Sequence, residues 1–280
     1  GCRSTVNFFW PGQVAETAIY GTALSATRVT AHYTAATTAP ATYASTVLAD
    51  APLLYTHYQA PPSPTAANAG TLGAAANGIF LPGSIAGVPG PVTPTYPGFA
   101  AGNKAAAFTA SGGAVQLPKF NFDTNTLTIA GWVNASNIQL AGAGIVVCDS
   151  GTTGAGLIID GVNGGFGPGY YWNNTAETYL WSPSQDSGLP QLPDSNWAYV
   201  ALVVQPTEAE IYIATTNNGA SFTSATNYTT HINQAFAGPT LIGTDAGNPL
   251  YSFNGAIDEV AIWNRALASG ELYSQFASAV

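Results

Sequence analysis

The chain has 280 residues, only 7% of which are charged, and its formal net charge is −9. Ordinary soluble domains contain roughly 25% charged residues, so small polar side chains must cover most of this surface. Binding of nucleic acid or anionic lipid needs clustered lysine and arginine. We therefore expect neither nucleic acid nor a membrane surface as a partner, because the five cations are dispersed as Arg3, Arg28, Lys104, Lys119 and Arg265.

The composition also indicates a secreted protein. The chain contains no methionine and no apolar run of the length that crosses a bilayer, so we expect no membrane insertion. We expect that Gly1 is a processed end left by removal of a signal peptide. The predicted location is therefore extracellular or on the cell surface.

The two cysteines, Cys2 and Cys148, allow one bridge or two separate thiols. An unpaired exposed thiol is a liability outside the cell, so we favour a bridge that ties down the N-terminal segment. A lipid on Cys2 is an alternative, and in that case Cys148 is a buried strand residue.

The first 33 residues alternate apolar and polar side chains in a strand-like way, with a turn at Pro11-Gly12. The Ala/Thr-rich residues 34–46 follow, and we interpret them as a spacer. The N-terminal segment has too much apolar surface for a loose tail, so it must pack on its own domain or on a neighbour. The residues expected to make this contact are Val6, Phe8, Phe9, Trp10, Ile19 and Tyr20.

The remaining chain has the pattern of an all-β domain, in which short apolar segments alternate with turn residues. Trp197–Val204 is apolar on both faces, which predicts a central strand covered on both sides. Gln205–Glu208 then predicts a hairpin turn, because Pro206 suits its second position. Further strands are expected at residues 105–108, 114–117, 127–133, 144–148, 156–160, 169–172, 209–214 and 240–243.

The apolar residues of the last strand change parity between Ile257 and Val260. A regular strand cannot bury both sets on one face, because side chains alternate with period two. A β-bulge at Asp258-Glu259 restores the register and turns a carboxylate sideways.

A family resemblance is carried by four stretches of the chain. Gly255–Leu267, which reads Gly-Ala-Ile-Asp-Glu-Val-Ala-Ile-Trp-Asn-Arg-Ala-Leu, resembles the closing strand of laminin-G-like, concanavalin A-like jelly-roll domains of secreted bacterial proteins. Leu127–Val133 and Trp197–Val200 fit two further strands of that family, and Val47–Tyr58 resembles its opening strand. The resemblance implies an antiparallel jelly-roll β-sandwich.

These observations predict two parts of the chain. Residues 1–46 form an N-terminal β extension with its spacer, and residues 47–280 form the laminin-G-like sandwich. We expect a short C-terminal helix that is capped by Ser269 and has Leu272 and Phe276 on one face.

An enzymatic site is not expected. Glycoside hydrolases of related fold place two carboxylates about 5–9 Å apart on one strand face. Glu208 lies in a turn next to Glu210, and the adjacent Asp258 and Glu259 point to opposite faces unless a bulge intervenes. The Glu-x-Asp-x-x-Glu pattern of laminarinase-like hydrolases is absent from the sequence. We therefore predict a non-catalytic protein.

The resemblance implies one structural calcium ion and no other cofactor. In similar domains the Asp of the Ile-Asp-Glu-Val stretch often joins a calcium site, and Asp258 matches that position. Calcium prefers several oxygen ligands, but Thr65–Gly70, where related domains have an acidic turn, contains no acidic residue. The alternative is that Asp258 accepts hydrogen bonds from backbone amides at the bulge.

A sugar site is the other candidate, because aromatic residues are concentrated in one region between strands. Exposed aromatic rings on a lectin-like sandwich form a platform for carbohydrate. The alternative is that these rings cover the edge of the core. The residues are Tyr170, Tyr171, Trp172, Tyr179 and Trp181.

Two functions follow from the sequence. The first is a non-catalytic structural protein, a subunit of a bacterial surface filament, sheath or layer that assembles with other copies of itself through the N-terminal arm. Strand addition would join the subunits, and low charge leaves sheet edges without Lys and Glu to keep them apart. The alternative is a carbohydrate-binding or adhesion module with glycans as partners.

Overall fold

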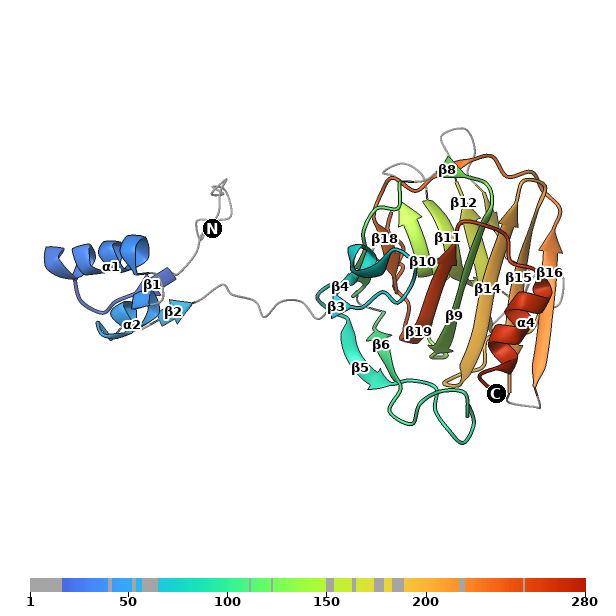
Figure 1. Ribbon diagram of the computed structural model, residues 1–280, viewed down its shortest axis with the longest axis horizontal. Coiled ribbons are helices and arrows are strands. Elements are labelled where there is room, and N and C mark those ends of the chain that lie inside the picture. Colours follow the sequence, from blue (N-terminus) through green and yellow to red (C-terminus); the bar gives the residue numbers. More distant parts are fainter. Residues whose placement is uncertain are drawn as a thin grey trace. The chain divides into compact units, whose positions relative to one another are not determined.

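The computed structural model describes residues 17–39, 42–51, 54–56, 65–110, 112–121, 123–149, 154–162, 165–173, 179–182, 189–216, 220–248 and 250–280. The chain divides into two compact units, Gly1–Pro61 and Pro62–Val280 (Figure 1). The boundary thus lies 15 residues after the predicted end of the N-terminal extension at residue 46. No helix among the described residues is long and apolar enough to cross a membrane.

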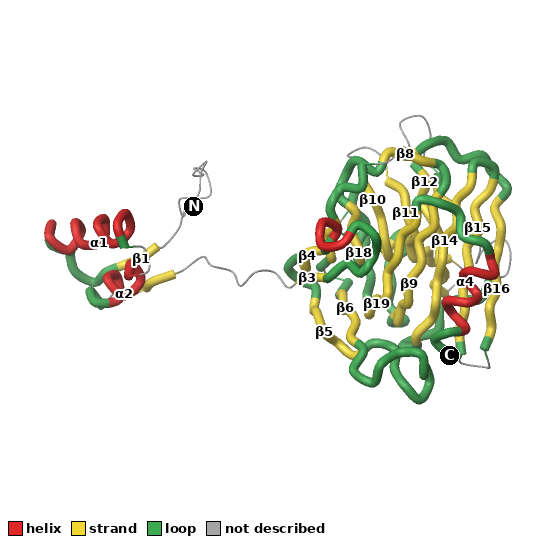
Figure 2. The backbone as a smooth tube through the Cα atoms, in the orientation of Figure 1, coloured by secondary structure: helices red, strands yellow, loops and turns green. Residues whose placement is uncertain are grey.

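The first unit is an αβ unit and not the predicted β extension. Strand β1 (Thr17–Ile19) pairs antiparallel with β2 (Leu54–Thr56). Helices α1 (Ala26–Thr38) and α2 (Tyr43–Leu48) lie between them in sequence (Figure 2). The predictions of a spacer over residues 34–46 and of an opening sandwich strand over Val47–Tyr58 were therefore wrong.

The sequence of α1 is ambiguous between strand and helix. Val29 and Tyr33 are four residues apart. Residues at this spacing point to the same side in a β-strand, where side chains alternate, and also in an α-helix, where one turn takes 3.6 residues. In the helix this face is exposed, with Val29 56% and Tyr33 71% accessible. The helix start is fixed by Ser25, whose hydroxyl oxygen accepts a hydrogen bond from the Arg28 amide at 3.3 Å.

The second unit is the predicted antiparallel β-sandwich (Figure 1). Its described strands form an eight-stranded sheet in the order β13-β12-β11-β10-β18-β7-β4-β3 and a seven-stranded sheet in the order β16-β15-β14-β9-β19-β6-β5, and β8 pairs with β17. The eight-stranded sheet consists of β3 (Thr65–Ala66), β4 (Gly78–Phe80), β7 (Val115–Leu117), β10 (Ala143–Asp149), β11 (Gly154–Val162), β12 (Gly165–Trp172), β13 (Leu180–Trp181) and β18 (Thr240–Ile242). The seven-stranded sheet consists of β5 (Ile85–Pro89), β6 (Lys104–Phe108), β9 (Leu127–Ala135), β14 (Trp197–Gln205), β15 (Glu208–Thr215), β16 (Ser221–Asn227) and β19 (Gly255–Trp263), and the remaining elements are η2 (Gly73–Ala76), β8 (Asp123–Thr124) and β17 (Gln234–Ala235).

Each strand predicted between residues 105 and 263 coincides with an observed strand. The central strand β14 is buried on both faces as expected, and Gln205 pairs with Glu208 to close the predicted hairpin. The alternating pattern did not reveal β3, β4 and β5, because they lie in a Pro- and Gly-rich stretch, nor did it reveal the Ser/Thr-rich β16.

Apolar residues gather in two layers. The main core lies between the sheets and includes Leu127, Ile145, Leu157 and Leu202. A second cluster lies on the outer face of the seven-stranded sheet, where helix α4 (Ser269–Ala277) packs through Leu272 and Phe276 (Figure 1).

The predicted bulge is present in β19. Its pairing with β9 shifts register between Asp258 and Ala261, and Glu259 has φ +49°. The predicted cap of α4 was wrong by one residue. The N-cap is Ala268, whose amide donates to the Glu271 carboxylate at 2.9 Å, so the capping contact comes from the Glu271 side chain and not from Ser269.

Candidate functional site

The predicted sugar platform is largely part of the core. Tyr170 and Trp172 of β12 point between the sheets and are 0% and 2% exposed. Their polar atoms are engaged there, because Tyr170 Oη lies 2.8 Å from His231 Nε2 and Trp172 Nε1 donates to the Ile232 carbonyl at 2.8 Å. The prediction that these two rings bind sugar was therefore wrong, since no ligand can reach their faces.

Tyr179 and Trp181 also support the core edge. Both pack against the main core, with ring centroids 5.7 and 5.9 Å from that of Tyr170. The Tyr179 hydroxyl accepts a hydrogen bond from the Asn227 amide. The alternative interpretation, in which the aromatic residues cover the edge of the core, thus describes four of the five predicted residues.

Tyr171 differs because successive strand residues point to opposite faces. It lies between Tyr170 and Trp172 in β12 and so faces away from the core, on the outer side of the eight-stranded sheet. Its partner across the strand pair is Leu180 of β13, which is 51% exposed. Tyr171 and Leu180 therefore form a small apolar patch on this face that is accessible to solvent.

A glycine makes room for a carboxylate beside Tyr171. Gly169 shares the outer face of β12 with Tyr171, because the two residues are two apart. A Cβ atom at Gly169 would lie 3.2 Å from Asp160 Cβ of β11. The bare backbone at Gly169 thus lets the Asp160 side chain lie close to β12.

A hairpin loop between β18 and β19 adds a second tyrosine. The hydroxyls of Thr244 and Ser252 lie 3.0 Å apart at its base, and the Gly144 amide of β10 donates to the Tyr251 carbonyl at 3.1 Å. A Cβ atom at Gly144 would lie 2.3 Å from the Thr244 carbonyl carbon. Only glycine permits this approach of the loop to the sheet.

A second glycine brings the two tyrosines together. Gly142 has φ +88°, and a Cβ atom there would lie 2.8 Å from the Tyr171 hydroxyl and 3.6 Å from Tyr251 Cγ. Tyr171 and Tyr251 therefore flank the same residue, and Tyr251 is 37% exposed.

Two carboxylates act on the Tyr171 hydroxyl. Burial raises its pKa to about 12, and Asp245, Asp160 and Tyr251 contribute in the same direction. The hydroxyl is therefore protonated at neutral pH and can donate a hydrogen bond as well as accept one. We call the accessible part of this group the Tyr171–Tyr251 surface, and it consists of Tyr171, Leu180, Asp245 and Tyr251, whereas Asp160 beside it is only 5% exposed.

Asp258 lies on the other sheet, at the bulge. Its Oδ2 atom accepts a hydrogen bond from Asn103 Nδ2 at 2.7 Å, and its Oδ1 atom accepts one from the Glu259 amide at 2.9 Å. Burial raises the pKa of Asp258 to about 6, and the hydrogen bond from Asn103 opposes this shift. Among the described residues, no group of three or more His, Cys, Asp or Glu side chains could hold a metal ion. These contacts fit the hydrogen-bonding interpretation, and calcium at Asp258 stays a prediction.

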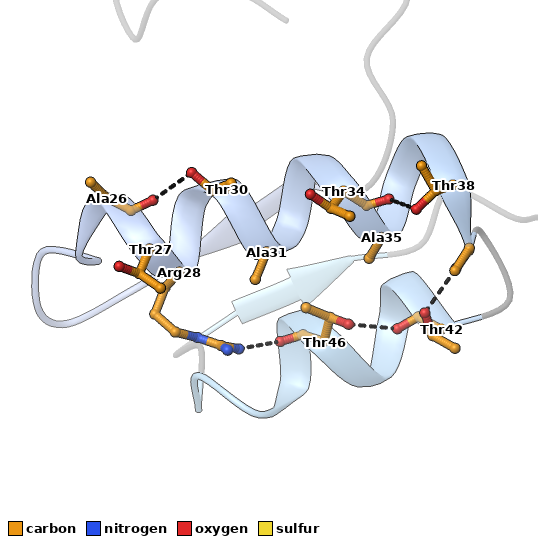
Figure 3. A pocket seen from close by; sticks show the side chains of 11 residues that line it. Ala26, Thr27, Arg28, Thr30, Ala31, Thr34, Ala35, Thr38, Thr42 and Thr46 are labelled. Carbon is orange, nitrogen blue, oxygen red and sulfur yellow. Dashed lines mark hydrogen bonds between the residues drawn. The ribbon is translucent and has the colours of Figure 1, made fainter.

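A groove of about 750 Å³ lies between α1 and α2 in the first unit (Figure 3). Alanine and threonine line it, and the hydroxyls of Thr30, Thr38 and Thr46 donate to carbonyls of their own helices at 2.7–2.9 Å. The Arg28 guanidinium donates to Asp50 at 2.6 Å and to the Thr46 carbonyl at 3.2 Å. These three hydroxyls and the guanidinium thus already have partners within the unit.

The predicted self-assembly residues are only partly described. Ile19 pairs with Leu54 in the first unit, and the Tyr20 ring centroid lies 6.1 Å from that of His32. Both residues thus make contacts within their own unit. Cys148 is buried in β10, and a bridge to Cys2 stays a prediction. The residues outside the described part of the chain are Cys2, Val6, Phe8, Phe9 and Trp10.

Comparisons with solved structures return sandwich domains of low sequence identity. Domain 4 of AbnA, an extracellular arabinanase from Geobacillus stearothermophilus in complex with arabinotriose, is 20% identical, with 61% of this chain and 76% of that chain covered and a TM-score of 0.46. The CBM40 of a Ruminococcus gnavus sialidase, bound to sialyllactose, is 16% identical, with 56% and 83% covered and a TM-score of 0.41. The botulinum neurotoxin serotype G binding domain is 14% identical, with 75% and 48% covered and a TM-score of 0.47, so this chain spans about half of that structure.

No curated protein matches the sequence. A family model does match it, over residues 109–272, and its description is the concanavalin A-like lectin/glucanases superfamily. This match spans more than half of the chain and contains three of the four stretches that carry the laminin-G-like resemblance, all except Val47–Tyr58. The chain therefore belongs to the concanavalin A-like lectin/glucanases superfamily.

Proposed function

We propose that this chain is a non-catalytic glycan-binding module of an extracellular protein, and that the Tyr171–Tyr251 surface is its binding site. One observation carries the proposal. Tyr171 lies on the outer face of the eight-stranded sheet beside a loop that carries Tyr251 and the Asp245 carboxylate, whereas α4 covers the outer face of the other sheet. The superfamily includes lectins and glucanases, so sugar is the ligand class that fits this surface.

The chemistry of the surface suits a sugar ring. A sugar presents apolar C–H groups on one face and hydroxyls around its edge. The C–H face packs on the negative face of a phenol ring, while the hydroxyls donate to the Asp245 carboxylate. The protonated Tyr171 hydroxyl supplies a donor as well. Tyrosine has only two side-chain torsions, so little conformational entropy is lost on binding.

The proposal of a non-catalytic role is supported by the missing Glu-x-Asp-x-x-Glu pattern. The two glutamates of β15 are engaged within the sheet, since Glu210 accepts from Ser224 at 2.6 Å and Glu208 from Gln205 at 3.1 Å. Both carboxylates have partners on their own sheet and so serve its structure.

Binding of the purified chain to a panel of oligosaccharides, measured by calorimetry, tests the proposal. Tyr171→Ala and Tyr251→Ala each remove a ring and should weaken binding at least about tenfold. Tyr228→Ala is the matched control, because Tyr228 is 81% exposed and lies after β16, in the other sheet. Equal affinity of all four proteins would rule out this surface. Release of reducing ends during incubation would instead show a hydrolase.

The other expected function, a filament or layer subunit, has less support. The two described arm residues, Ile19 and Tyr20, make contacts within their own unit. Self-assembly through residues 1–46 therefore stays a prediction. Sedimentation of the full chain and of a chain that lacks these residues would test it.

A further inference from the structure

We propose that the Tyr171–Tyr251 surface continues over the loop of residues 136–142 and takes glycans whose sugars carry apolar substituents such as acetyl groups. This inference rests on the proposed function and adds the ligand class. It comes from the loop itself, in which a polar side chain is buried while the aliphatic side chains on either side of it are exposed.

The loop between β9 and β10 reverses the usual distribution of polar and apolar side chains. Gln139 is 7% exposed, whereas Ile138 is 69% exposed and Leu140 is 46% exposed. Glutamine is mostly found on protein surfaces, while isoleucine and leucine are among the residues most often buried. A single exposed aliphatic residue is common, but two of them beside a buried amide group need a structural cause.

The cause is the loop that precedes β19, which holds Gln139 inside. The Oε1 atom of Gln139 accepts a hydrogen bond from the Asn254 amide at 3.0 Å. Its Nε2 atom donates to the Ser136 carbonyl at 3.2 Å and also to the Asn254 carbonyl. Asn254 in turn donates from Nδ2 to the Ile138 carbonyl at 3.0 Å. These hydrogen bonds fix Gln139 in the interior and leave Ile138 and Leu140 in solvent.

The same loop runs into the Tyr171–Tyr251 surface. The Ala143 amide donates to the Leu140 carbonyl at 3.0 Å, which closes a turn with Gly142 at its third position and φ +88°. Gly142 is the residue that both tyrosines flank. Leu250, which is 74% exposed, comes immediately before Tyr251. The aliphatic side chains that lie around the two phenol rings are therefore Ile138, Leu140 and Leu250.

Exposed apolar side chains are concentrated at this place. Among the described residues of the second unit, eleven large apolar side chains are exposed, and five of them belong to this surface and its loops. A cluster of exposed apolar side chains marks a binding site more often than scattered ones do. Residues 136–142 include no ionisable side chain, so this part of the surface suits an uncharged group. The five are Ile138, Leu140, Leu180, Leu250 and Tyr251.

An acetylated sugar combines the chemistry of both parts of the surface. Its ring and hydroxyls fit the two tyrosines and the Asp245 carboxylate, whereas the methyl of an acetyl group needs only an apolar contact. The polar groups beside the patch favour such a ligand over a purely apolar protein surface. Burial of one methyl group should raise the affinity about fourfold, which corresponds to about 0.8 kcal/mol.

Calorimetry on the full chain with matched neutral sugars tests this inference. Cellotetraose, xylotetraose and mannotetraose are each compared with the same oligosaccharide carrying acetyl esters. Cellotetraose is also compared with chitotetraose, which has an acetamido group in place of each C2 hydroxyl. The acetylated member of a pair that binds should bind at least about threefold more tightly than its partner.

Two variants assign the effect to the loop. Ile138→Ser and Leu140→Ser each remove an aliphatic side chain, and together they should bring the ratio of acetylated to unsubstituted affinity to about one. Ile85→Ser on β5 and Leu72→Ser beside η2 are the matched controls, with side chains 56% and 61% exposed. They lie far from β12 in the order of the sheets, so they should leave the ratio unchanged within about a factor of 1.5.

The outcomes separate the two proposals. Equal affinity for both members of every pair, or a ratio that survives the two serine substitutions together, overturns the inference and leaves the proposed function standing. Failure of every sugar to bind, or binding that survives both Tyr171→Ala and Tyr251→Ala, overturns the proposed function itself. Sedimentation provides one more check. Self-association that the serine substitutions abolish while the ratio stays unchanged would assign the patch to a contact between copies and overturn the inference.

Discussion

The outer faces of the two sheets both carry aromatic residues, but among the described elements an α-helix packs only over the seven-stranded sheet, where α4 covers them. On the seven-stranded sheet Trp132, Tyr199 and Tyr212 are 2–3% exposed. On the eight-stranded sheet Tyr171 is partly exposed and Leu180 is 51% exposed, although Ile158 on the same face is 0% exposed. An aromatic residue in a strand is therefore no sign of binding by itself. What decides its role is whether a distant segment packs over it.

The covering segment is held by specific contacts. The Phe276 ring of α4 stacks on Trp132 with centroids 6.0 Å apart. The Thr128 hydroxyl donates to the Arg265 carbonyl at 2.8 Å and accepts from the Leu267 amide at 2.9 Å. This buried hydroxyl fixes the chain where it crosses the sheet before α4 begins.

The largest expected loss of stability comes from a substitution on the face of the seven-stranded sheet that α4 covers. Trp132→Ala removes a ring that contacts Tyr96, Phe99, Tyr199 and Phe276, at centroid distances of 5.2–6.0 Å. We expect a loss of about 3–5 kcal/mol in the free energy of unfolding, measured in urea. Tyr171→Ala on the open face should cost under about 1 kcal/mol. Equal costs would mean that the two faces do not differ.

The next effect concerns the glycine that admits the hairpin loop. Gly144→Ala places a Cβ atom 2.3 Å from the Thr244 carbonyl carbon, so either the loop or the strand must move. We expect a cost of about 1–3 kcal/mol in the free energy of unfolding and weaker glycan binding, because Tyr251 shifts with its loop.

Gly102→Ala is the matched control, since no atom lies within 4 Å of the new Cβ. It should change stability by less than about 0.5 kcal/mol. A Gly144→Ala protein with unchanged stability and unchanged binding would show that Gly144 does not position the loop.

A smaller effect is expected for the pH dependence of stability, to which the largely buried Asp258 of the seven-stranded sheet should contribute and exposed carboxylates should not. The folded-state pKa of Asp258 is raised from 3.8 to about 6, so the folded protein holds this proton more tightly than the unfolded chain. The resulting stabilisation is full below about pH 4 and is lost as the pH rises through about 6. Two pKa units correspond to at most about 3 kcal/mol, and solvent screening reduces this to about 1–2 kcal/mol.

Urea unfolding between pH 4 and 7 measures this slope. Asp258→Ala should flatten it, whereas Asp123→Asn at an exposed position should not. A slope that survives in Asp258→Ala would assign the titration to another group. Repeating the pH 7 measurement with calcium and with a chelator tests the calcium prediction at the same residue.

The smallest effect is expected at Leu180. It is 51% exposed on the open face, so Leu180→Ala should change the free energy of unfolding by less than about 0.5 kcal/mol. Ile145→Ala in the main core, where Ile145 is 1% exposed, should cost about 2–5 kcal/mol. A large cost at Leu180 would indicate that this face is covered after all.

The strands of the sandwich could be predicted because each has its own local signal. The alternation in Leu127–Val133 and the apolar run of Trp197–Val204 depend only on neighbouring residues. The bulge at Asp258-Glu259 was also predicted, since the parity change is visible in the sequence. By contrast α1 was missed, because the spacing of Val29 and Tyr33 fits two periods.

The candidate site could be predicted only in part. Strand parity alone separates Tyr171, which faces away from the core, from Tyr170 and Trp172, which face into it, and applying it to these three residues would have selected the one ring that is partly exposed. Asp160, Asp245 and Tyr251 carry no comparable signal. They come from β11 and from a loop about 90 residues later, and only the pairing of β10 with β11 and β18 brings them together.

Because of the hairpin loop beside Gly142 and Gly144, the residues of this surface can be replaced without changing the fold of the sandwich. The hydroxyls of Thr244 and Ser252 contact each other at the base of the loop, so the base is held together without the residues at the tip. Leu250 at that tip is 74% exposed and contributes little to stability. Libraries that randomise the residues between Asp245 and Tyr251 can therefore retune ligand preference while the sandwich beneath stays intact, much as variable loops do on an antibody framework.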